Sequence, residues 1–197
     1  GNGGAGIDLI STVTATGTGV INAVVRNNEI SNNAGGGIVS QMFGPNSGGA
    51  TNNLINLTVG GTSAQTNDIT GNGNVGISYS VAGNAKGVFT LSNSTISGTT
   101  NGADPLTFGD GIYLNRADSS LLLADISNVT SINNAGNGML VTTQGNDKND
   151  PNQPMSGTIN SVDWNNSIFD NNGLNGVAFR TRGDSMLVAD GQGNFTR

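Results

Sequence analysis

The chain repeats one stretch of sequence, which is clearest in Asn28-Glu-Ile-Ser-Asn-Asn33-Ala-Gly-Gly-Gly37-Ile38. Its second half is an Asn, three residues, a Gly and an aliphatic residue, and Asn67-Asp-Ile-Thr-Gly-Asn72-Gly-Asn-Val-Gly76-Ile77 has the same form. Five copies have this form, a sixth has Thr107 in place of the Asn, and the aliphatic residues of the six follow one another at intervals of 27 to 39 residues. A turn of constant form at variable intervals is typical of a solenoid, because insertions leave at the corners without disturbing the stacked strands.

Short strand-like segments fill each interval. Aliphatic and polar residues alternate after the Gly, as in Ile112-Tyr-Leu114. A longer second segment follows, such as Val20–Val25 or Leu54–Val59, and a brief third one ends on an Ile before the next Asn turn. The third-segment isoleucines are Ile30, Ile69, Ile96, Ile132 and Ile168. The pattern predicts an all-β, right-handed, single-stranded parallel β-helix of about six coils with three strands each, a single solenoid domain over residues 1–197.

Other architectures explain the sequence less well. Gly and Asn interrupt every window long enough for a helix, and Val, Ile and Thr outnumber good helix formers. A sandwich or barrel of short strands would not account for a turn with constant internal spacing. The repeated turn therefore favours the solenoid over both alternatives.

The Asn of each turn is expected to stack on the Asn of the next coil. A side-chain amide both donates and accepts, so it can bond the turn backbone and the amide above it. The predicted ladder is Asn2, Asn33, Asn72, Asn134 and Asn172, interrupted at Thr107. A second candidate row is Asn22, Asn56 and Asn160. The alternative is that Asn is present only because it suits turns.

Composition excludes several kinds of chemistry. There is no Cys and no His, so disulfides, thiolate metal sites and imidazole catalysis are absent. Only seven Lys and Arg stand against thirteen Asp and Glu, which argues against a nucleic-acid partner. No stretch is apolar for long enough to span a membrane. A Cys-free, acidic chain rich in Asn, Ser and Thr is typical of secreted or cell-surface bacterial proteins.

The repeats resemble those of the pectate-lyase-like superfamily, and most of all the β-helix regions of large bacterial surface and secreted proteins. The two stretches Asn28–Ile38 and Asn67–Ile77 carry the likeness, which extends over nearly the whole chain. The resemblance implies the fold and a groove beside the first-strand sheet where enzymes of this fold act on acidic polysaccharides. Polygalacturonase-like members use Asp with a His, which this chain lacks. Pectate lyases use Arg or Lys as the base, with calcium held by Asp.

Charged residues follow the first strand in three successive coils, in Arg116-Ala-Asp118, Asp147-Lys148-Asn-Asp150 and Arg180-Thr-Arg182-Gly-Asp184. Stacked on one corner, Asp118, Asp147, Asp150 and Asp184 would form a calcium site. Arg116, Arg180 and Arg182 would then be candidate catalytic residues, or would contact an acidic sugar. The simpler interpretation, which we favour, is that a corner loop carries soluble residues that pair on the surface.

Two further features suggest weaker sites. The insertion Thr99–Asp110 contains Asp104 and Asp110, a second calcium-loop candidate that lacks densely alternating oxygen ligands. Tyr113, facing the groove, and Trp164, at another corner, are the aromatic residues expected to be exposed for sugar binding, whereas Tyr79, Phe89 and Phe179 are expected to point inward. Packing of Trp164 within a loop is the competing interpretation.

The sequence thus favours a structural or adhesive segment of a secreted or cell-surface bacterial protein over an enzyme. The chain opens inside a turn, so we expect it to be a piece of a longer solenoid that associates end to end with itself or with other surface-protein domains. The alternative is a calcium-dependent polysaccharide lyase or carbohydrate-binding module.

Overall fold

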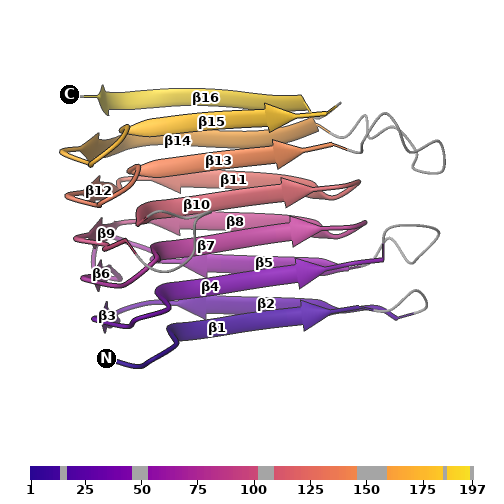
Figure 1. Cartoon of the computed structure of the whole chain (residues 1–197), viewed down its shortest axis with the longest axis horizontal. Helices are drawn as coiled ribbons and strands as arrows, with labels where there is room; N and C mark the ends of the chain where they lie inside the picture. The colour runs from indigo at the N-terminus through magenta and orange to yellow at the C-terminus, as the bar shows by residue number, and fades with distance from the viewer. Residues whose placement is uncertain (14–16, 46–52, 102–108, 146–158, 184–185, 196–197) are drawn as a thin grey trace.

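The computed structural model describes residues 1–13, 17–45, 53–101, 109–145, 159–183 and 186–195 (Figure 1). All regular elements within these residues are β-strands, and every pair of neighbouring strands is parallel. The chain advances by one rung with each coil, from the N-terminus at the bottom of Figure 1 to the C-terminus at the top. The predicted all-β parallel solenoid is confirmed.

The first strands of successive coils form one sheet, which we call sheet A. Its six strands are hydrogen-bonded in the order β1-β4-β7-β10-β13-β15. They therefore span roughly 24 Å along the solenoid axis, at about 4.8 Å a step. Their bounds are β1 Ala5–Thr12, β4 Gly36–Phe43, β7 Val75–Ala82, β10 Asp110–Ala117, β13 Met139–Gln144 and β15 Val177–Arg182.

The second strands form the opposite layer, which we call sheet B. Short third strands close the coils from β1 to β12 at the left of Figure 1. The predicted segments Val20–Val25 and Leu54–Val59 coincide with β2 and β5. Sheet B contains β2 Val20–Val25, β5 Leu54–Val59, β8 Lys86–Ser92, β11 Leu121–Ser127, β14 Ile159–Asp170 and β16 Met186–Phe195. The third side contains β3 Glu29–Ser31, β6 Asn67–Thr70, β9 Ser94–Ser97 and β12 Thr130–Ile132.

The predicted count of six three-stranded coils needs correction. Within the described residues, only the coils from β1 to β12 have three separate strands, so the solenoid has about four turns of that form. In the later part, β14 and β16 each run through the corner between sheet B and the third side. Their pairing continues across a register shift between Asn165 and Ser167, where Asn166 has a φ of 44°. A one-residue corner bends the chain there without ending the strand.

The core consists of in-register rows of inward side chains. Ile38, Ile77, Ile112 and Met139 occupy one row of sheet A and have no exposed surface. Burial of each such side chain stabilises the fold by about 2 kcal/mol. Tyr79 and Phe89 point inward as predicted, with their ring centroids 5.0 Å apart. Phe179, predicted to be inward, lies in the last strand of sheet A and is 41% exposed.

The inward row of the third side differs from the prediction in two coils. Ser131 and Phe169, not Ile132 and Ile168, continue the row of Ile96. Ile168 is 42% exposed, whereas Phe169 is fully buried. In every coil the inward residue stands two positions before a residue of positive φ, and this corner sets which residue points inward. The positive-φ residues are Asn32, Gly71, Gly98, Asn133 and Asn171.

Candidate functional site

An inner asparagine ladder begins directly after these positive-φ corners. The Asn33 backbone N–H and side-chain Nδ2 both donate to Oδ1 of Asn72, at 3.0 Å each, and Asn72 Nδ2 donates to the Ile30 carbonyl at 2.8 Å. Asn134 donates to Asn172 in the same way, at 3.1 and 2.9 Å. The backbone N–H of Asn2 donates to Oδ1 of Asn33 at 3.1 Å. The predicted hydrogen bonds between asparagines of successive coils are therefore present.

Thr99 occupies the ladder position in the coil between those of Asn72 and Asn134. Its N–H and Oγ1 donate to Oδ1 of Asn134 at 3.2 and 3.0 Å, and its Oγ1 also bonds the Gly109 carbonyl. Thr107 itself lies outside the described residues. The prediction was wrong because it counted back from Ile112, whereas this coil carries its insertion between the ladder residue and the strand. The sequence held the correct signal, since Ile96-Ser-Gly-Thr99 matches Ile69-Thr-Gly-Asn72.

The ladder also explains the Gly of the repeated turn. A Cβ at Gly37, Gly111 or Gly138 would lie 3.1, 2.6 or 2.7 Å from Nδ2 of the ladder Asn in the following coil. Those asparagines are Asn72, Asn134 and Asn172. The Asn and the Gly of the turn are thus two halves of one packing arrangement, which positions the strands of sheet A.

The second predicted row does not form a ladder. Asn22 and Asn56 are in register on the outer face of sheet B. Asn160 is fully buried, and its Oδ1 accepts from the Leu122 N–H at 3.0 Å while Nδ2 donates to the Met186 carbonyl at 2.8 Å. All three residues follow an Ile in the sequence, but Ser161, and not Asn160, is in register with Asn22 and Asn56.

A second polar row lies beside the inner ladder, immediately before the Gly of three coils. Asn175 Nδ2 donates to Oδ1 of Asn137 at 2.8 Å, and Asn137 donates to Oδ1 of Asp110 through its backbone N at 2.6 Å and its Nδ2 at 2.7 Å. Asp110 is fully buried, and its Oδ2 has no hydrogen-bond partner. Burial raises the pKa of Asp110 to about 6, against the opposing effects of the Asn137 hydrogen bonds and the Arg180 charge. We call Asp110, Asn137 and Asn175 the outer row.

The predicted charged corner is not assembled as expected. Arg116 is the largest fully buried side chain, and it donates from Nε to the Ser120 carbonyl at 2.8 Å and from Nη1 to the Gln144 carbonyl at 3.0 Å. It points inward because β10 continues to Ala117, so the alternation of Ile112 and Leu114 reaches Arg116. A buried Arg116 is not available to act on a surface substrate.

The remaining charged residues of the predicted corner lie in different parts of the structure. Asp118 forms part of a corner at φ 61°, where its Oδ2 accepts from the Gly83 N–H at 3.1 Å. Arg180 and Arg182 belong to β15 itself, and both are exposed on the outer face of sheet A. Four residues of the predicted cluster, together with Asp104 of the insertion, lie outside the described part of the chain: Asp147, Lys148, Asp150 and Asp184.

The two aromatic candidates have different surroundings. Tyr113 is half-buried on the outer face of sheet A, where its hydroxyl accepts from Thr142 Oγ1 at 3.2 Å. Trp164 was expected at an exposed corner, but it is only 8% exposed and packs against Phe179 with ring centroids 5.7 Å apart. It faces inward because it is in register with Ile126, and Gly191 in the next strand leaves room for its ring.

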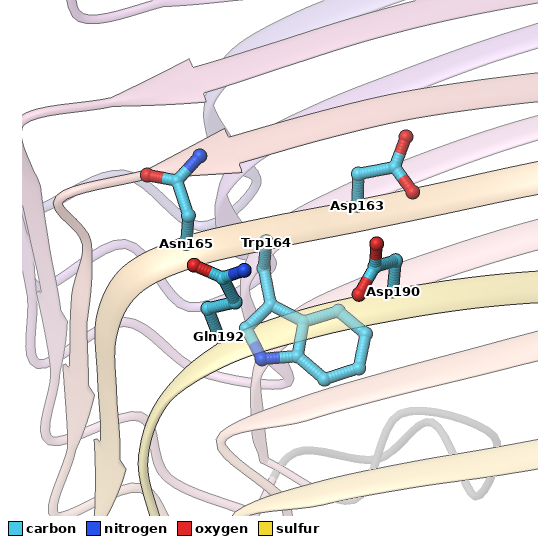
Figure 2. Close-up of a pocket in the computed structure, with 5 residues that line it drawn as sticks. All are labelled: Asp163, Trp164, Asn165, Asp190 and Gln192. Atoms are coloured by element: carbon cyan, nitrogen blue, oxygen red, sulfur yellow. The ribbon is translucent and has the colours of Figure 1, made fainter.

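Sequence reasoning missed an acidic row on the outer face of sheet B. Asp125, Asp163 and Asp190 are in register on three neighbouring strands, and all three are exposed. Figure 2 shows Asp163 and Asp190 beside Trp164, around a shallow hollow of about 210 Å³ that Asn165 and Gln192 complete. The signal was a second internal repeat, Leu121-Leu-Leu-Ala-Asp125 and Met186-Leu-Val-Ala-Asp190. Within the described residues, no three acidic side chains are grouped closely enough to hold a metal ion.

Comparison with protein-family models, with curated proteins and with solved structures finds no match. Among the described residues, no helix is long and apolar enough to cross a membrane. The class of protein is therefore defined by the fold alone: an all-β parallel solenoid with an internal asparagine ladder.

Proposed function

We propose that this chain is a structural or adhesive solenoid segment, a rigid spacer in a secreted or cell-surface bacterial protein with a fold related to the pectate-lyase-like superfamily. The observation that carries the proposal is the stacking of ladder and core side chains from coil to coil. Side-chain hydrogen bonds link three pairs of neighbouring coils, through Asn33–Asn72, Thr99–Asn134 and Asn134–Asn172. A stack in which each coil contacts only its neighbours extends by adding coils, which suits a spacer.

Small-angle X-ray scattering together with limited proteolysis tests the spacer role. We expect a scattering curve that fits a single rigid particle, unchanged between low and high salt, because hydrogen bonds and apolar rows hold the coils together. We also expect the sixteen strands of the described residues to resist cleavage. A scattering curve that requires an ensemble of bent or partly unfolded shapes would contradict the proposal.

The second candidate is a calcium-dependent polysaccharide lyase or a carbohydrate-binding module. It is favoured by the exposed Arg180 and Arg182 on the outer face of sheet A, next to a polar strip in which Thr142 bonds Asn115 at 2.7 Å. Guanidinium groups bind the carboxylates of acidic sugars in bidentate fashion.

Ultraviolet absorbance of unsaturated products from uronate polymers tests the lyase activity. Activity lost in Arg182→Ala and kept in Arg26→Ala would support this candidate. Absence of activity on all acidic glycans, with no calcium-dependent change in melting temperature, would exclude it.

A further inference from the structure

An open polar hollow lies on the third side of the solenoid, at its corner with sheet B. Its volume is about 360 Å³, and its lining comes from three successive coils, at β6, β9 and β12. These three strands lie one above another at the left of Figure 1. Every described side chain that lines the hollow is a Ser, Thr, Asn or Asp, so its whole surface consists of hydroxyl, amide and carboxyl groups.

The hollow exists because the corner before the third side differs in length between coils. Residues 60–66 separate β5 from β6, whereas Asn93 alone separates β8 from β9. The longer corner therefore forms one wall beside the shorter ones. Asn93 Nδ2 donates to the Gly61 carbonyl at 2.6 Å, and the Gln65 N–H donates to the Thr62 carbonyl at 2.8 Å. These bonds fix the wall, so the hollow is preformed.

A row of three outward side chains crosses the hollow. Asp68 is in register with Thr95, and Thr95 is in register with Thr130, on three neighbouring parallel strands. Successive residues of the row are therefore about 4.8 Å apart. All three are accessible to solvent, and their carboxylate and hydroxyl groups form no hydrogen bond with another described residue. The row offers a ligand one charged acceptor and two groups that both donate and accept.

The lining argues against several classes of ligand. Among the described residues, no Lys or Arg lines the hollow, and Glu29 is in register with Asp68 on the neighbouring strand, so phosphates and uronates are repelled. A hard cation needs more oxygen ligands of negative charge than Asp68 alone supplies. β6 and β9 are paired on both edges, so a peptide cannot add to them as a further strand. A neutral ligand that carries many hydroxyl groups remains.

A neutral sugar matches the row in chemistry and in spacing. The carboxylate of Asp68 accepts hydrogen bonds from two adjacent hydroxyl groups of a sugar ring, and charge-assisted bonds of this kind are stronger than neutral ones. Thr95 and Thr130 repeat the polar contact at steps of one coil, close to the length of one sugar residue in an extended glycan. Since no described aromatic or aliphatic side chain lines the hollow, little apolar surface is buried and a single site binds weakly.

We propose that this hollow binds an extended neutral glycan that runs along the solenoid axis, with one sugar residue on each of the three coils. Asp68 holds the hydroxyl groups of the first sugar residue, and Thr95 and Thr130 hold those of the next two. The proposal rests on the adhesive form of the function above and names its ligand. It differs from the lyase candidate in place, on the third side rather than on sheet A, and in the charge of the glycan.

Nuclear magnetic resonance titration of the whole chain tests the site. The probes are β-linked oligomers of glucose, mannose and galactose with one, two and three residues, and glycerol and trigalacturonate serve as comparisons. We expect at least one neutral trisaccharide to shift the backbone amide signals of Asp68, Thr95 and Thr130 with a Kd of about 1 mM. Binding should weaken with each sugar residue removed, because each loses the contacts of one coil. Glycerol and trigalacturonate should leave these signals unchanged.

Two variants locate the contact. Asp68→Asn should weaken binding of the trisaccharide about tenfold, because it removes the charged acceptor. Thr130→Val keeps the shape of the side chain and removes its hydroxyl, and should weaken the same binding about threefold. Asp163→Asn and Thr90→Val make the same two changes on the outer face of sheet B, and neither should affect binding.

Three results would overturn the proposal. The first is that no neutral probe shifts the three signals at about 10 mM. The second is that glycerol or trigalacturonate shifts them as strongly as the trisaccharide, and the third is that the sheet B variants weaken binding as much as Asp68→Asn. Scattering from the free chain does not depend on these results. A rigid particle that binds no neutral glycan would therefore leave the spacer function standing while the glycan proposal fails.

Discussion

The inner ladder and the outer row both stack polar side chains in register from coil to coil, yet they end differently. In the inner ladder, Asn72 accepts two hydrogen bonds from Asn33 and donates one to Ile30, so both its oxygen and its nitrogen are bonded. In the outer row, Asp110 accepts two bonds through Oδ1 and leaves Oδ2 buried without a partner. An amide continues a row because it both donates and accepts, whereas a carboxylate only accepts and therefore ends it.

The largest expected effect follows from removing an inner amide. Asn72→Ala leaves two donors of Asn33 and the carbonyl of Ile30 without partners in the core, which should lower the free energy of unfolding by about 2–4 kcal/mol. Urea denaturation monitored by circular dichroism measures this loss. Asn56→Ala, on the outer face of sheet B, is the matched control and should change stability by less than about 0.5 kcal/mol. Equal losses in the two variants would mean that the ladder contributes no more than a surface Asn.

The glycine that accommodates the ladder gives the next effect. In Gly138→Ala the new Cβ would lie 2.6 Å from the Gly176 carbonyl oxygen and 2.7 Å from Asn172 Nδ2, so backbone must move. Overpacking of this kind destabilises by about 1–3 kcal/mol. Gly3→Ala is the control, since no atom lies within 4 Å of the position that its new Cβ would take. Thermal melts of both variants should separate them clearly, and a Gly138→Ala protein as stable as wild type would break the link between the Asn and the Gly of the turn.

A substitution in the outer row should raise the stability of the protein, whereas the two substitutions above lower it. Asp110→Asn replaces a buried charge with a neutral amide. Its pKa in the folded protein, about 6, is above the ordinary value of 3.8, so the folded state binds the proton more tightly. Stability from this group is therefore complete below pH 3.8 and is lost as the pH rises through 6. We expect Asp110→Asn to be more stable than wild type at pH 7 by about 1 kcal/mol, with little difference at pH 3.5.

Urea midpoints at several pH values between 3.5 and 8 test this sign. Asp68→Asn, which changes an exposed carboxyl on β6, is the control and should leave the pH profile of the wild type unchanged. The prediction would be wrong if the wild-type protein became more stable between pH 4 and pH 7 and Asp110→Asn abolished that increase.

The inner ladder and the outer row also differ in how far the sequence predicts them. The inner ladder was predictable, because the Asn and Gly of the turn are close in sequence and each has a local conformational reason. Thr99 was missed because the insertion in that coil shifts the spacing to Ile112, although Gly98 at positive φ marked the corner. Arg116 was assigned to the surface because its charge was weighed above the alternation of β10. Stacking between coils, as in the outer row, depends on the register of neighbouring strands. Because the corners vary in length, this register cannot be counted from the spacing of residues in the sequence.

The acidic row of sheet B offers the smallest and most salt-dependent effect. Asp163 has Asp125 on one neighbouring strand and Asp190 on the other, so two like charges face it directly. Like charges opposite one another in a sheet are destabilising, and Asp163→Asn should therefore raise stability by a few tenths of a kcal/mol. Because all three side chains are exposed, salt screens the repulsion, and the gain should shrink between about 0.02 M and about 0.5 M salt. Thermal melts at the two ionic strengths measure it, with Asp68→Asn again as the control. Asp163→Asn could instead destabilise the chain equally at the two salt concentrations. Repulsion between the carboxylates would then not decide the stability of this row, and carboxylates would stack here as readily as the amides of the inner ladder.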